Sequence, residues 1–190
     1  ALAWGAVLAY RGSILAGCGA LLIATCCFSN EFWSIDAAGL TWAVDRFCLL
    51  GLVGLFAAQC LVRRADHKPV ATGEILLGLL LVLIVVSTFT HDWRTLGPDQ
   101  VSIVMHLVNG YLIPATVYWI VRESAINERS TRILHAILAC FGAYLALTAI
   151  CEVARFWPLV FPKYIANPNV GIHFGRARGP MVQSAQLGTF

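Results

Sequence analysis

The chain contains 190 residues, of which 59% are hydrophobic and only 12% carry a charge. Soluble domains contain about 25% charged residues, so a chain this apolar cannot cover itself with polar surface in water. This composition predicts a membrane protein. A net charge of +3, without a basic face interleaved with aromatic residues, is not typical of a protein that binds nucleic acid.

Apolar segments long enough to cross the roughly 30 Å hydrocarbon core of a bilayer follow one another along the chain. In lipid every backbone polar group needs an internal partner, so these segments are predicted to be helices. We expect an all-α, polytopic membrane helical bundle over residues 1–156, followed by an extracytoplasmic loop over residues 157–190 that also begins the next helix. The expected spans are 1–10, 12–28, 40–62, 74–89, 101–121 and 133–153. Because the sequence begins without Met inside an apolar run and ends at Phe190 just after a new apolar pattern starts, we also expect it to be a fragment of a larger transmembrane protein, from its N-terminal part.

The positive residues of the short loops predict the orientation of the helices. Alternate loops form two sets, and one set contains seven Lys or Arg residues whereas the other contains only Arg94. The first set is therefore predicted to be cytoplasmic, and residues 157–190 are predicted to lie outside the cytoplasm. The seven residues are Arg11, Arg63, Arg64, Lys68, Arg122, Arg129 and Arg132.

The seven cysteines lie in apolar runs, and none has CxxC spacing or a histidine cluster beside it. Cysteine often behaves as a small hydrophobic residue, so we interpret these thiols as packing groups within helices. The pattern predicts neither a metal site nor a disulfide framework.

Several polar pairs within or beside the spans are interpreted as mainly structural, with a functional contact as the alternative. Polar side chains in a membrane helix usually point into the bundle, where they find partners. Pro114 is also expected to kink its span. The pairs are Asp45 with Arg46, His106 with Asn109, and Glu152 with Arg155.

Two arginines stand close together in the last loop. Arg176 and Arg178 flank Ala177, and Gly175 and Gly179 lie on either side of them. Arginine offers planar donors that match phosphate or carboxylate oxygens, and glycine lets a backbone approach a ligand closely. The pattern fits an anion site that holds a diphosphate, and it fits contacts with lipid headgroups equally well.

The segment GRARGPMVQSAQLG resembles the signature of the O-antigen ligase and O-antigen polymerase family. In that signature a span ends in an outer loop with an Arg-x-x-Gly core, which here begins at Arg176 and ends at Gly179. Two upstream segments, LTWAVDRFCLL and WPLVFPKYIANP, are also similar to segments of the family. After Pro180 the stretch MVQSAQ departs from the commoner pattern, so both ligase and polymerase remain open.

The resemblance implies a polytopic glycosyltransferase of the GT-C type, active in the biosynthesis of lipopolysaccharide or another polysaccharide. Such an enzyme transfers a glycan from an undecaprenyl-diphosphate carrier to a lipid or glycan acceptor at the outer face of the bacterial inner membrane. It needs no nucleotide sugar, metal or other cofactor. By this resemblance Arg176 contacts the carrier diphosphate, Arg178 helps, and the catalytic residues are expected downstream of residue 190. A transporter or flippase-like protein that binds lipid phosphates is the alternative.

Overall fold

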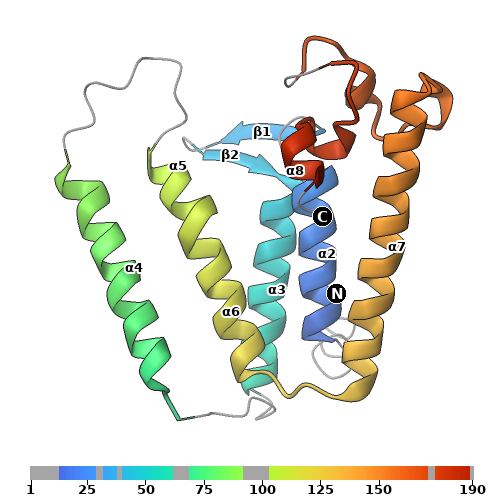
Figure 1. Ribbon diagram of the computed structural model, residues 1–190. Helices are drawn as coiled ribbons and strands as arrows, with labels where there is room; N and C mark the ends of the chain where they lie inside the picture. Colours follow the sequence, from blue (N-terminus) through green and yellow to red (C-terminus); the bar gives the residue numbers. More distant parts are fainter. Residues whose placement is uncertain are drawn as a thin grey trace. The chain divides into compact units, whose positions relative to one another are not determined.

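The computed structural model describes residues 13–28, 32–37, 40–61, 69–91, 103–170 and 174–188 (Figure 1). The chain divides into two compact units, residues 1–63 with 126–190 and residues 64–125. The expected span at residues 1–10 lies outside the described residues. The elements are α2 (Ile14–Cys27), β1 (Ser34–Ala37), β2 (Leu40–Ala43), α3 (Val44–Leu61), α4 (Thr72–Thr90), α5 (Ile103–Leu107), a π-helical turn (Val108–Leu112), α6 (Ile113–Glu123), α7 (Glu128–Val153), three 3-10 turns (Trp157–Leu159, Lys163–Ala166 and Gly179–Met181) and α8 (Ser184–Gly188).

The predicted helical fold class is confirmed. Among the residues that the structure describes, four helices are long and apolar enough to cross a membrane, judged by length and composition, and α2 is a shorter apolar helix of 14 residues. In α4 no residue is buried, and its large apolar side chains include Leu83 at 65% exposure. Such a surface is stable where lipid is the solvent, which supports a multi-pass membrane protein. The four helices are Val44–Leu61, Thr72–Thr90, Ile103–Glu123 and Glu128–Val153.

A β-hairpin precedes α3, which corrects the prediction that a span begins at residue 40. Strand β1 pairs antiparallel with β2, and Ser34 lies opposite Ala43 in the register. Tryptophan and threonine favour strands, and Trp42 of β2 packs against Phe47 of α3, with ring centroids 5.7 Å apart. The helix therefore begins at Val44.

Helix α2 lies between α3 and α7 and contacts both of them (Figure 1). A methyl group added at Gly17 would lie 2.9 Å from Leu52 Cδ1 on α3, and one added at Gly19 would lie 2.9 Å from Ile137 Cγ2 on α7. Small residues of this kind let membrane helices approach closely. A buried cluster then joins the end of α2 to α7, and it consists of Cys27, Phe141 and Leu145.

In the second unit, the helix from Ile103 to Glu123 contains one widened turn. The π-helical segment Val108–Leu112 lies just before Pro114. Proline has no N–H to donate, and its ring clashes with a carbonyl one turn earlier in a regular helix. The expected effect of Pro114 thus takes the form of a π-helical turn within a continuous helix. His106 and Asn109, near this turn, are exposed.

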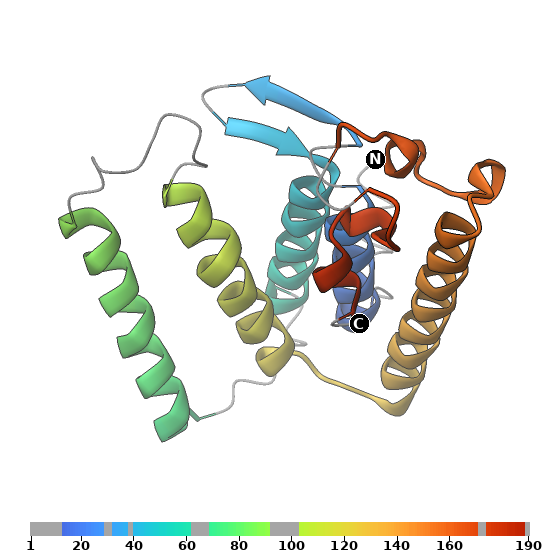
Figure 2. The ribbon, with the colours of Figure 1, turned by 45° about the horizontal axis from the view of Figure 1, so that its top comes forward.

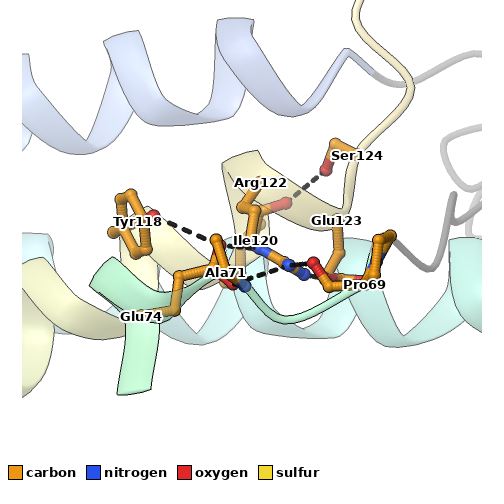
Figure 3. A network of polar contacts seen from close by, with 8 residues as sticks. All are labelled: Pro69, Ala71, Glu74, Tyr118, Ile120, Arg122, Glu123 and Ser124. Atoms are coloured by element: carbon orange, nitrogen blue, oxygen red, sulfur yellow. Dashed lines mark hydrogen bonds and ion pairs between the residues drawn. The ribbon is translucent and has the colours of Figure 1, made fainter. Parts of the chain in front are cut away.

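Also in the second unit, Arg122 at the end of α6 joins the start of α4 through a polar network (Figure 3). Its guanidinium donates to the carboxylates of Glu74 and Glu123, and its Nη2 also lies 2.6 Å from the carbonyl oxygen of Pro69. The Tyr118 hydroxyl donates to Glu74 at 3.4 Å. Charged groups at the ends of membrane helices are stable when they pair in this way.

The predicted orientation can be tested by cysteine labelling in intact cells. Lys163 and Arg129 are both exposed, and each is replaced singly by cysteine in a protein without native cysteines. We expect a membrane-impermeant maleimide to label the Lys163 position and to leave the Arg129 position unlabelled until the cells are opened. Labelling at Arg129 from outside would contradict the orientation.

Candidate functional site

The segment that follows α7 contains three short 3-10 turns, and we call it the cap and define it as residues 154–170 and 174–182 (Figure 2). Helix α7 ends because the N–H of Phe156 donates to the carbonyl of Cys151 at 2.8 Å and the N–H of Arg155 donates to that of Glu152 at 3.1 Å. Arg155 adopts the left-handed conformation, with φ at 58°. This is a Schellman motif, and Pro158 follows it, as is common after such an end. The chain therefore turns sharply away from the helix axis.

The cap has a small core of its own, although its four prolines exclude a continuous helix. Val160 and Ile165 are completely buried and pack against the end of α7. Burial of such a side chain contributes about 1.5–3 kcal/mol to stability. The Tyr164 hydroxyl lies 3.1 Å from the carbonyl oxygen of Cys27 on α2 and 2.6 Å from that of Pro180. These contacts fix the cap on the ends of α2 and α7.

A buried ion pair joins Glu152, near the end of α7, to Arg178 of the cap. One oxygen of Glu152 accepts hydrogen bonds from the backbone N–H groups of Arg178 and Gly179, at 2.7 and 2.9 Å. Its other oxygen accepts from Arg178 Nε at 3.3 Å, and the two side chains are 1% and 0% exposed. Arg178 Nη1 donates to the carbonyl of Val170 at 2.6 Å, and Nη2 donates to that of Ile165 at 2.7 Å. Both charges are thus neutralised and hydrogen-bonded inside the protein.

Aromatic side chains complete the surroundings of Arg178. Its guanidinium carbon lies 4.9 Å from the centre of the Phe174 ring, which stacks on Trp157 at 5.8 Å with an interplanar angle of 10°. This geometry revises two expectations. Arg178 was expected to help Arg176 hold a diphosphate, but its donors are directed to internal acceptors. The sequence spacing allows Glu152 to pair with Arg155, but the ionic partner of Glu152 in the structure is Arg178.

Arg176 differs from Arg178, because its side chain is exposed. The glycines on either side have positive φ angles, 95° at Gly175 and 59° at Gly179. Other residues rarely adopt such angles, so glycine is required for this course of the backbone. At Gly179 an added methyl group would also lie 3.0 Å from Leu187 Cδ1. The buried Arg178 thus fixes the backbone two residues away, while the guanidinium of Arg176 faces outward.

The exposed surface of the cap is cationic and partly apolar. The sequence from residue 153 to residue 190 contains no Asp or Glu, and Arg155, Lys163 and Arg176 are exposed. Phe156 is 52% exposed and Leu159 is 61% exposed. Aromatic and basic side chains together are typical of the membrane–water interface, where they meet the lipid headgroups. An anionic headgroup or a diphosphate is the ligand that such a surface suits.

Among the described residues, no group of three His, Cys, Asp or Glu side chains is arranged to hold a metal ion. Asp45 and Arg46 lie in the first turn of α3. The candidate site consists of the exposed Arg176 and of the buried pair of Glu152 and Arg178, which fixes the backbone beside Arg176.

Comparison of the chain with protein-family models, with curated proteins and with solved structures found no match.

Proposed function

We propose that the chain is the membrane part of an O-antigen ligase-like glycosyltransferase of the bacterial inner membrane. In this proposal the protein takes a glycan from an undecaprenyl-diphosphate carrier and passes it to a lipid or glycan acceptor at the outer face. The observation that supports it most is Arg176, an exposed guanidinium on a backbone that the buried Arg178 and Glu152 hold in place.

The chemistry of the transfer explains why a fixed cation is useful. The bond between the sugar and a diphosphate oxygen breaks, and the acceptor hydroxyl releases its proton to a base or to water as its oxygen bonds to the sugar. The diphosphate leaves with additional negative charge. A cation that is already in position stabilises this charge in the transition state. Arg176 can donate two parallel hydrogen bonds to phosphate oxygens, and Arg155 and Lys163 add positive potential to the same cap.

The apolar part of the cap supports the same proposal. The diphosphate of a polyprenyl carrier lies at the membrane interface because its isoprenoid chain is in the hydrocarbon. The exposed Phe156 and Leu159 suit that depth. The cap can then present Arg176 to the carrier head without extracting the lipid from the bilayer.

A transfer assay tests the function directly. The full-length protein is placed in lipid vesicles with an undecaprenyl-diphosphate-linked oligosaccharide, labelled on the sugar, and a lipid A core acceptor. We expect the label to move to the acceptor while undecaprenyl diphosphate is released in equal amount. Absence of transfer to lipid A core and to a second glycan chain would contradict a glycosyltransferase of this type.

The second candidate is a non-enzymatic transporter or flippase-like protein. It is favoured by the π-helical turn Val108–Leu112, since transporters use irregular membrane helices at their binding sites. The same vesicles distinguish the two functions. A transporter would move the labelled carrier between leaflets and leave the bond between sugar and diphosphate intact.

A further inference from the structure

An apolar groove runs between α2 and α7 in the first unit. Its volume is about 530 Å³, and its lining is almost entirely apolar. Helix α2 contributes Ile23 and Cys27, α7 contributes one face that includes Ile137 and Phe141, and Phe161 of the cap lies at one end. A groove of this shape on membrane helices suits a hydrocarbon chain.

The other end of the groove is basic. A second hollow, of about 690 Å³, is lined by Arg129, Arg132, Ile133 and Ala136. Ile133 and Ala136 also line the apolar groove, so the two hollows are neighbours along the same face of α7. The combined site therefore has two cations at its mouth and an apolar channel behind them, which matches the head and the tail of an anionic lipid.

The length of α7 places this mouth at the level of the headgroups. The helix has 26 residues and is about 39 Å long at 1.5 Å per residue, whereas the hydrocarbon core is about 30 Å thick. Its first turns, with Arg129 and Arg132, therefore extend beyond the hydrocarbon. The loop charges predict that this end is cytoplasmic, where the leaflet carries anionic lipids.

The charges around the mouth also favour an external anion. Arg129 and Arg132 are exposed. Arg132 Nη2 lies 3.4 Å from a carboxylate oxygen of Glu128, and these side chains are 82% and 93% exposed. A pair so exposed is weak, so a phosphate can replace the carboxylate as the partner of Arg132.

We propose that this site binds an anionic phospholipid, with its phosphate between Arg129 and Arg132 and one acyl chain in the groove between α2 and α7. The phosphate end of the site lies at the opposite end of α7 from the cap, and the groove reaches Phe161 of the cap. The proposal does not depend on the proposed glycan transfer, and it gives the protein a selective lipid ligand on the cytoplasmic side.

The test uses the full-length protein in bilayer nanodiscs that contain a trace of a phosphatidylglycerol with a photoreactive diazirine on one acyl chain. A phosphatidylcholine with the same chains is the comparison probe. After illumination, mass spectrometry measures the labelling of residues 133–144. We expect strong labelling by the phosphatidylglycerol probe. We expect labelling to be about fivefold lower in Arg129→Gln and about thirtyfold lower in Arg129→Gln/Arg132→Gln, since each cation near the surface contributes about a factor of five.

Two further variants make the result specific. Arg155→Gln removes one charge at the other end of α7 and is expected to label like the wild type. Ala136→Trp fills the groove and is expected to reduce labelling by both probes. Equal labelling of the wild type by the two probes would overturn the proposal, because the groove would then hold bulk lipid without selection. The proposal would also be overturned if Arg129→Gln/Arg132→Gln were labelled by the phosphatidylglycerol probe as strongly as the wild type. Absence of labelling of residues 133–144 in the wild type would overturn it too, because the groove would then be closed to lipid.

Discussion

Replacing Arg178 with methionine is expected to open the cap and to expose the peptide bond after Lys163 to trypsin. The variant leaves Glu152 buried without its ionic partner, and removal of one partner of a buried ion pair costs about 3–5 kcal/mol. The carbonyls of Val170 and Ile165 lose their donors as well. A loss of about 3 kcal/mol raises the population of the open cap, and with it the cleavage rate, about 150-fold. The measurement is the rate of cleavage at Lys163 in the purified protein.

A matched control is the ion pair of Glu128 and Arg132, which lies on α7 as Glu152 does. These two side chains are 93% and 82% exposed. Arg132→Met breaks an ion pair of the same chemical type, and we expect it to cost no more than about 0.5 kcal/mol. Arg178→Lys retains the charge without the planar fork, so cleavage at Lys163 is expected to lie between the wild type and Arg178→Met. If Arg178→Met is cleaved within twofold of the wild-type rate, the buried pair does not hold the cap together.

Arg176→Ala is expected to lower glycan transfer about 150-fold in the full-length protein. In the proposed function Arg176 stabilises the leaving diphosphate, and loss of about 3 kcal/mol of transition-state stabilisation corresponds to that factor. Arg176→Lys keeps the charge but cannot donate two parallel hydrogen bonds, so we expect a smaller loss. The measurement is the initial rate of transfer to the acceptor in vesicles, divided by the amount of folded protein.

The trypsin assay supplies the control for this series. Because Arg176 is exposed, its replacement is expected to leave the cleavage rate at Lys163 unchanged. A loss of transfer in an intact cap then reports on chemistry rather than on folding. Wild-type transfer by a folded Arg176→Ala protein would remove the diphosphate role and would leave contact with lipid headgroups as the function of this residue.

The membrane helices could be predicted because hydropathy reports directly on burial in lipid. Their ends could not, because polar residues decide where a helix begins. The span predicted at 133–153 begins as a helix at Glu128, since the Asn127 side chain accepts a hydrogen bond from the N–H of Ser130 at 2.8 Å. This N-cap hydrogen bond satisfies one of the free N–H donors of the first turn of α7. That turn is polar, so a hydropathy window does not include it.

The arginine motif was visible in the sequence, but the different environments of its two arginines were not. Spacing indicates that Arg176 and Arg178 are close, and it carries no information about Glu152, which lies 26 residues before Arg178. A carboxylate at the end of an apolar span needs a cation as its partner, and this requirement can be read from the sequence. Sequence proximity then favours Arg155 as the partner, because only the fold of the cap brings Arg178 to the end of α7.

The bond from Tyr164 to the carbonyl of Cys27 has a consequence for biosynthesis, because the two residues are 137 positions apart in the chain. A ribosome adds about 5–20 residues per second, so Tyr164 is synthesised on the order of 7–27 seconds after Cys27, whose carbonyl it contacts. During that interval the carbonyl is open to water or to the insertion machinery. Docking of the cap on α2 is thus a late event in assembly, because it requires residues that are made after α7.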